Sequence, residues 1–78
     1  MNVDYLIKMA NQIGSFFETQ PNQAQARKDL AKHLQNGWEI RMRSALLAHL
    51  DKNQGEGLLP IVKEAVAQHR HEWPGHTS

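Results

Sequence analysis

The histidines are the first side chains in this sequence that could do chemistry. The chain has five of them, and His69, Glu72 and His76 have a spacing that would suit a metal ion on one helix face. That helix would have to continue through the Pro-Gly pair at 74–75, where proline ends helices. His49 and His69 fall on apolar faces, where a hydrogen-bonded core histidine is the commoner outcome. We therefore expect no metal bound by this chain.

A second group of side chains capable of chemistry is Trp38 with Arg41 and Arg43. Arginine offers a planar fork of N–H donors that can clamp a phosphate or a carboxylate. Nucleic-acid binding is one interpretation, but the formal net charge of +1 lacks the strong positive charge of nucleic-acid binders. Tryptophan and arginine are also typical anchors of protein interfaces. The sequence therefore favours a protein partner over nucleic acid.

The sequence contains no catalytic constellation and no membrane segment. No nucleophile, base and orienting group share a suitable spacing, and no glycine-rich phosphate loop occurs. The chain has no cysteine, which excludes thiolate zinc sites, iron–sulfur ligation and cysteine nucleophiles. No run approaches the about 18 apolar residues of a membrane span, and the amino terminus lacks signal-peptide features. We expect a cytoplasmic protein that has no enzymatic activity, binds no cofactor and has no membrane partner.

Capping residues divide the chain into short helices, so the sequence predicts an all-α fold. Asn2 is a good N-cap, and Pro60 suits the first turn of a helix. A chain of this length makes one domain, which we place at residues 1–73. The four helices that we expect run over about 3–19, 22–35, 38–50 and from 58 onward.

Glycine and proline mark where we expect the helices to end. Asn36-Gly37 predicts a left-handed cap after the second helix, and the glycines and polar residues at 51–57 predict a loop. Gly14 lies inside the first helix, which predicts that another backbone approaches closely there. From Trp73 onward we expect the chain to fray, with a flexible tail at 74–78.

The first helix has more apolar surface than one core face requires. At about 100° per residue, its apolar side chains between Leu6 and Phe17 cover roughly 200° of the helix wheel, with Ile7 on one flank. A surface helix needs a stripe only a little over ~100° wide. In the third helix, Ile40 and Leu47 lie roughly opposite the main apolar face. Two such faces predict a helix that a partner or a second copy of the chain covers.

The residues that we expect to contact a partner lie on the flanks of these apolar surfaces, at their amide borders and around the arginines. They are Ile7, Asn11, Gln12, Phe16, Trp38, Ile40, Arg41, Arg43 and Leu47. When the chain is isolated, we expect it to cover the same surfaces by self-association, since a two-fold dimer uses one patch twice.

Three motifs follow one another between about residues 3 and 66. The residues that carry them are Met9, Ala10, Asn11, Gln12, Ile13, Gly14, Phe16 and Phe17, then His33, Leu34, Trp38, Arg41, Met42 and Arg43, and finally Gly57, Leu58, Pro60 and Ala65. In this order they resemble the delta subunit of bacterial NAD-dependent formate dehydrogenases that contain molybdenum or tungsten. Gly37 and Ile40 depart from that family, which tends to have phenylalanine and proline at these positions.

The resemblance implies a non-catalytic component that serves the assembly or stability of the active complex. In that family the redox chemistry belongs to the large subunits, which carry molybdopterin, iron–sulfur clusters and FMN, and the delta chain carries none of these. The expected partners are therefore the large subunits of formate dehydrogenase. Two alternatives remain open, namely a homodimeric helical interaction protein and a helix-turn-helix-like DNA binder that places the helix at 38–50 in the groove.

Overall fold

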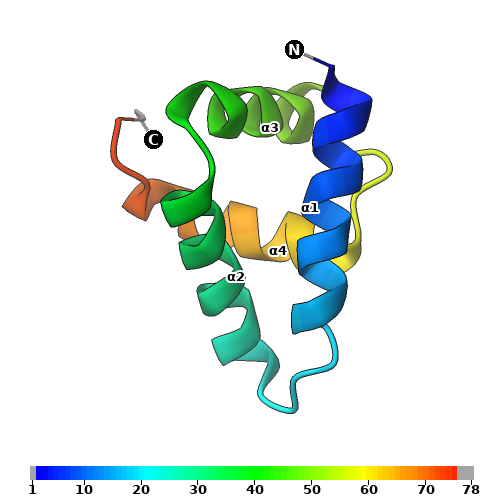
Figure 1. The fold of residues 1–78 in the computed structure, drawn as a ribbon, viewed down its shortest axis with the longest axis vertical. Helices are drawn as coiled ribbons and strands as arrows, with labels where there is room; N and C mark the ends of the chain where they lie inside the picture. The colour runs from blue at the N-terminus through cyan, green and yellow to red at the C-terminus, as the bar shows by residue number, and fades with distance from the viewer. Residues whose placement is uncertain (1, 76–78) are drawn as a thin grey trace.

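Within residues 2–75, four α-helices and one short 3-10 turn make up the fold, so the all-α class is confirmed. The computed structural model describes residues 2–75. The helices are α1 (Val3–Phe17), α2 (Gln23–Gly37), α3 (Ile40–Asn53) and α4 (Pro60–His69), followed by the 3-10 turn η1 (Arg70–Glu72). In Figure 1, α1 and α2 form the arms of a V, α3 crosses its open end, and α4 crosses lower down and packs against both arms.

Asn2 caps α1 as the sequence predicted, and the side chain of Asn22 caps α2. The Asn2 side chain accepts a hydrogen bond from the backbone N–H of Asp4 at 2.8 Å, and Asn22 accepts one from Gln25 at 3.0 Å. These bonds satisfy N–H groups that have no partner within the helix itself. Pro60 is the first residue of α4, where its missing N–H has no consequence.

The connection between α2 and α3 differs from the expected glycine cap. Gly37 is the last residue of α2 and is not in the left-handed region, and Trp38 follows in extended conformation (φ −104°, ψ 139°). The extended backbone directs the Trp38 side chain into the core, and α3 begins only at Ile40. At its other end α3 continues into the expected loop, and Gln54 supplies the left-handed cap with φ 54°.

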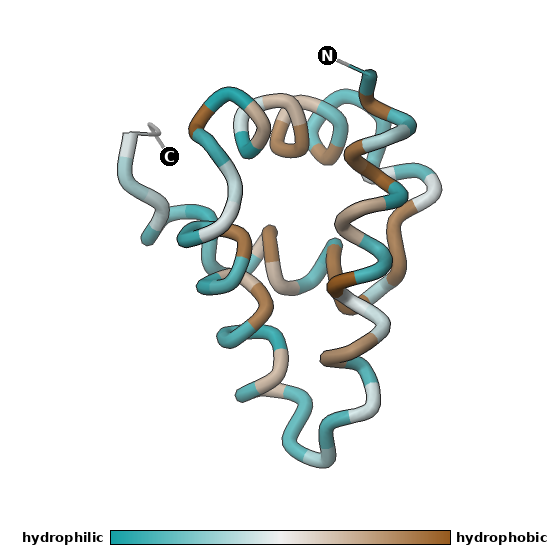
Figure 2. Tube along the Cα trace, in the orientation of Figure 1, coloured by the Kyte–Doolittle hydropathy of each residue, from teal (hydrophilic) through white to brown (hydrophobic). Residues whose placement is uncertain are grey.

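The core lies where the four helices meet, and α4 contributes its whole inner face. Apolar segments recur along all four helices, whereas the connection between α1 and α2 is polar (Figure 2). The buried apolar side chains that contact one another are Leu6, Ala10, Ala26, Leu30, Leu34, Trp38, Leu46, Leu47, Leu58, Ile61, Val62, Ala65, Val66 and Trp73. Gly14 allows α4 to approach α1, because a Cβ at Gly14 would lie 2.6 Å from Cγ2 of Val62. The approach is therefore close as predicted, but by a side chain rather than a backbone.

The wide apolar arc of α1 is mostly covered by the chain's own helices. α1 packs against α2, α3 and α4 at once, so that Leu6, Ala10 and Gly14 are buried. The flanking residues Ile7 and Phe17 pack against the edges of the same core. A helix with three neighbours needs an apolar arc wider than one contact requires. The width of the arc was therefore a poor indicator of a missing partner.

The expectation that the chain frays from Trp73 onward is wrong. The Trp73 side chain is only 2% exposed, and its indole N–H donates to the backbone carbonyl of Ala31 at 3.1 Å. The Arg70 guanidinium forms a paired contact with the Asp51 carboxylate at 2.6 and 2.9 Å. The segment after α4 therefore folds back onto α2 and α3. Of the expected tail, residues 76–78 lie outside the described residues.

Candidate partner-binding surface

The residues expected to contact a partner divide into exposed, half-buried and buried groups. Gln12, Phe16, Ile40 and Arg41 are exposed, Ile7 and Asn11 are half-buried, and Trp38, Arg43 and Leu47 are buried. Only the exposed group can meet a partner without rearrangement of the fold. The structure therefore does not bring the whole set together on one surface.

Asn11 belongs to the chain's internal structure and not to the rim of an interface. Its side-chain amide donates to the backbone carbonyl of Gly57 at 2.9 Å and accepts from the backbone N–H of Leu59 at 2.9 Å. Both ends of the amide are therefore occupied by the segment that leads into α4. The expectation of a rim contact is wrong, because the partner of this amide lies far along the same chain.

Trp38 and Leu47 are core residues, so the idea of two opposed apolar faces on α3 is wrong. The expected helix at 38–50 included Trp38, and its helix wheel placed Trp38 and Leu47 on opposite faces. In the structure, α3 begins after Trp38. Since Trp38 is not part of the helix, the inner face of α3 includes Arg43, Leu46 and Leu47, all of which are buried. Of the proposed outer flank, only Ile40 is exposed, at 49%.

Arg43 was expected to be an exposed charge, and it is 4% exposed. Its guanidinium carbon lies 5.6 Å from the centre of the Trp73 ring, which is a cation–π geometry. Its Nε and Nη1 atoms have no acceptor within residues 2–75 and lie out of reach of solvent. Arg41, two positions earlier, points to the exposed side of α3. A single exposed arginine in this motif weakens the DNA-binding alternative.

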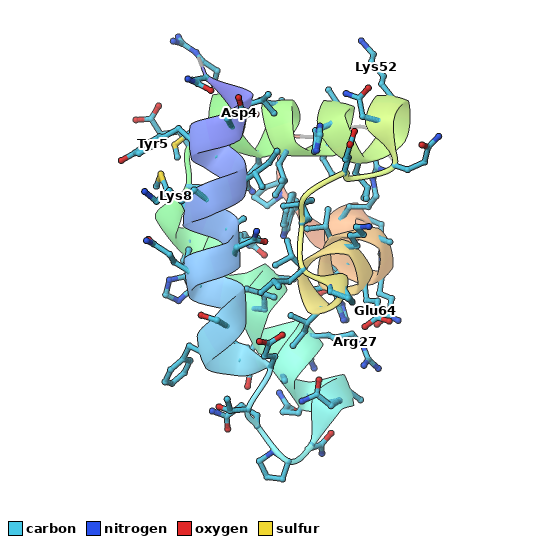
Figure 3. All side chains as sticks on the ribbon, turned by 90° about the vertical axis from the view of Figure 1, so that its right-hand side faces the viewer. Asp4, Tyr5, Lys8, Arg27, Lys52 and Glu64 are labelled. Atoms are coloured by element: carbon cyan, nitrogen blue, oxygen red, sulfur yellow. The ribbon has the colours of Figure 1, made fainter. Side chains whose placement is uncertain are left out.

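The largest exposed apolar side chains of α1 lie along one line, which we call the Tyr5–Phe16 stripe (Tyr5, Met9, Gln12 and Phe16). At about 100° per residue, Tyr5 and Phe16 fall within about 20° of each other on the helix wheel. Tyr5 is 62% exposed and Phe16 is 65% exposed, with Met9 half-buried between them. Figure 3 shows Tyr5 projecting from α1 on the side away from α4. The sequence analysis missed Tyr5, although its spacing from Phe16 was visible there.

A chain of ring contacts supports the Phe16 end of the stripe. The rings of Phe16 and Phe17 meet edge to face with their centres 5.2 Å apart. Phe17 in turn meets the His33 ring of α2 in the same manner at 6.1 Å. Edge-to-face pairs are favourable beyond their buried area, so Phe16 is exposed but held in place.

Two of the described histidines, His49 and His69, make hydrogen bonds within the chain. Nε2 of the buried His49 lies 2.7 Å from the carbonyl of Glu56, which confirms the hydrogen-bonded core histidine. Nδ1 of His69 lies 3.1 Å from the Glu72 carboxylate, and this hydrogen bond lowers the pKa of that carboxyl. Within residues 2–75, no group of three or more potential ligands is placed to hold a metal ion. His76 lies outside the described residues.

One comparison with known proteins gives a family. Residues 5–66 match the family model described as the NADH-dependent formate dehydrogenase delta subunit FdsD. The chain belongs to the FdsD family. The matched residues include α2 and α3 entirely, together with most of α1 and α4, and the resemblance drawn from the motifs is confirmed. Arg70–Glu72 and the residues after them lie beyond the part that matches the FdsD family. No curated protein and no solved structure matches this chain.

Between residues 2 and 75, none of the helices is both long enough and apolar enough to cross a bilayer.

Proposed function

We propose that this chain is a non-catalytic delta subunit, or an assembly and stability factor, of an NADH-dependent formate dehydrogenase, and that it acts through a helical protein–protein interface. The observation that supports this proposal is the family match, which extends from α1 into α4. The large subunits of the dehydrogenase are then the partners. They would carry molybdopterin, iron–sulfur clusters and FMN, and this chain would hold none of them.

The Tyr5–Phe16 stripe is the part of the surface that best suits such a partner. Aromatic side chains are the usual anchors of protein interfaces, because they bury a large area and lose little conformational entropy. Tyr5 and Phe16 are both more than half exposed in this chain. Gln12 between them offers an amide that can pair with backbone groups of the partner. We therefore place the centre of the interface on this face of α1.

The size of the stripe favours a large partner over a second copy of the chain. A fully buried aromatic side chain contributes about 150–250 Å², whereas stable interfaces bury about 800 Å² on each side. Two exposed rings and their neighbours offer roughly half of that area. A larger protein can extend its contact around the stripe, to surfaces that include Arg41 and Ile40.

We also propose a cytoplasmic location, since NADH is a nucleotide of that compartment.

Co-purification with the large subunits tests the proposal. The chain is co-expressed with the large subunits of an NADH-dependent formate dehydrogenase, and complex formation and formate oxidation are measured. Replacing Tyr5 and Phe16 together by serine is expected to weaken the association more than about tenfold. The helix content is expected to remain unchanged, because both side chains are exposed.

A double variant on α4 serves as the matched control. Glu64 and Ala67 are both exposed, and Figure 3 shows Glu64 far from Tyr5. Serine at these two positions is expected to leave the association unchanged. A wild-type chain that neither co-purifies with the large subunits nor affects formate oxidation would contradict the proposed function. Equal binding by both double variants would place the interface elsewhere.

A further inference from the structure

Arg43 is a buried charge whose donors are not fully used within the chain. It lies on the inner face of α3 and is 4% exposed, and its Nε and Nη1 have no acceptor within residues 2–75. The Trp73 ring at 5.6 Å offers an attractive face but no hydrogen-bond acceptor for those two atoms. Buried N–H groups of a guanidinium that have no acceptor destabilise a fold, and replacing such a charge by an apolar side chain often stabilises it. In the part of the chain that the structure describes, Arg43 therefore has two N–H donors that the fold leaves unused.

The cover over Arg43 comes from residues 70–75, which we call the C-terminal strap. In Figure 1 the strap leaves α4 and runs up beside the beginning of α3. The Trp73 ring lies over the guanidinium. Gly75, in left-handed conformation with φ 82°, sits against the Ile40 side chain, because a Cβ there would lie 2.7 Å from Ile40 Cδ1. The strap thus covers the first turn of α3, including Arg43.

The strap and the residue beneath it differ in how they relate to the family. Arg43 lies within the residues 5–66 that match the family model, and the strap lies entirely after them. The contacts that hold the strap within residues 2–75 include the indole hydrogen bond from Trp73 to Ala31, the His69–Glu72 hydrogen bond and the Arg70–Asp51 pair. That pair joins two partly exposed side chains, which contribute little to stability. The Trp73 ring, which is 2% exposed, adds burial to these contacts.

We propose that Arg43 is a binding anchor for a carboxylate side chain of the large-subunit partner, and that the strap lifts from α3 when the partner binds. The proposal rests on the proposed function. A guanidinium pairs with a carboxylate through two parallel N–H···O bonds, and such a pair is strongest where water is excluded. Once the strap is lifted, the partner supplies both the carboxylate and new apolar cover for the Trp73 ring.

The first test separates stability from binding. Arg43→Met keeps an unbranched apolar side chain and removes the guanidinium with its charge. The melting temperature of the isolated chain is expected to rise by about 5 °C, while binding to the large subunits is expected to weaken at least tenfold. Lys52→Met removes an exposed charge from the same helix and is expected to change neither quantity. A lower melting temperature for Arg43→Met, or its failure to fold, would overturn the proposal, because Arg43 would then be a structural residue.

The second test uses the wild-type chain and follows the strap itself. Hydrogen exchange of the backbone amides at 70–75 is measured in the free chain and in the complex. A lifted strap exchanges faster in the complex, although binding normally slows exchange at a contact surface. Exchange that is slower or unchanged would show that the strap stays in place and would overturn the proposal.

The two proposals fail in different ways. If the wild-type chain does not bind the large subunits, this result contradicts the proposed function, and Arg43 then has no large-subunit carboxylate to bind. If the wild-type chain binds and Arg43→Met binds equally well, the proposed function survives and the role of Arg43 falls.

Discussion

Asn11 joins α1 to the segment before α4 through both ends of its side-chain amide. The amide oxygen accepts from the backbone N–H of Leu59, the N-cap residue of α4. Backbone N–H groups at the start of a helix have no acceptor within the helix, and Leu59 has no side chain that could cap them. The other end holds the carbonyl of Gly57, whose left-handed φ of 89° turns the chain toward α4. A single side chain thus fixes how the last helix enters the core.

Asn11→Ala is therefore expected to destabilise the fold. It leaves a partly buried N–H and a carbonyl without their partner, which costs about 1–3 kcal/mol. Urea denaturation followed by circular dichroism measures the change. Gln12→Ala, at an exposed neighbouring position, is the control and should remain within about 0.5 kcal/mol of the wild type. Equal stability of the two variants would show that the Asn11 bonds contribute nothing.

The starts of α1, α2 and α4 were readable from the sequence to within about two residues, because each depends on a few neighbouring residues. Asn2, Asn22 and Pro60 act within one turn of their own position. The errors concern residues whose conformation depends on distant contacts. Gly37 ends α2 without a left-handed turn, because the extended Trp38 backbone places an indole in the core. Trp73 was misjudged since its indole partner, the carbonyl of Ala31, lies in another helix.

The candidate site was harder to predict than the fold, for a related reason. A helix wheel shows the direction of a side chain but not how many helices surround it. Leu47 and Arg43 were given outward roles, although α3 buries both. Phe16 and Arg41 were correctly judged to be exposed. Nothing local distinguishes these two pairs, because the difference lies in how α1 and α3 each pack against the other helices.

Acid is expected to loosen the attachment of η1 to α3. The hydrogen bonds from Arg70 hold the pKa of the Asp51 carboxyl below its ordinary value of 3.8. The pair therefore stabilises the fold fully above about pH 4, and this contribution is lost as the pH falls through the lowered pKa. The melting temperature of Asp51→Asn is expected to fall less steeply than that of the wild type below pH 4. Identical slopes would mean that the pair does not contribute.

At the scale of the whole molecule, little apolar surface remains uncovered. Within residues 2–75, the large apolar side chains that are exposed are Val3, Tyr5, Phe16 and Ile40. Two of these four side chains, Tyr5 and Phe16, belong to the Tyr5–Phe16 stripe. One face of α1 therefore carries much of the exposed apolar surface that could contact a second molecule. The expected self-association of the isolated chain stays a prediction, and the small area now makes it weak.

Phe16→Glu is expected to shift that weak self-association toward the monomer. A carboxylate in the stripe would have to lose its hydration in any contact between two copies. Sedimentation over a wide concentration range measures the equilibrium, and circular dichroism checks that the helix content is retained. Glu64→Gln, on the side of the molecule away from Tyr5, is the control. A wild-type chain that stays monomeric at high micromolar concentration would contradict the prediction.

The burial of Trp38 and Trp73, the two tryptophans of the chain, has an optical consequence. Indole fluorescence shifts to longer wavelength when water reaches the ring, so the folded chain should emit at the blue end of the tryptophan range. Global unfolding would move the emission of both rings. Lifting the strap into water would move only that of Trp73, since Trp38 lies between α2 and α3. A half-sized red shift at full helix content would therefore be the spectral signature of an open strap.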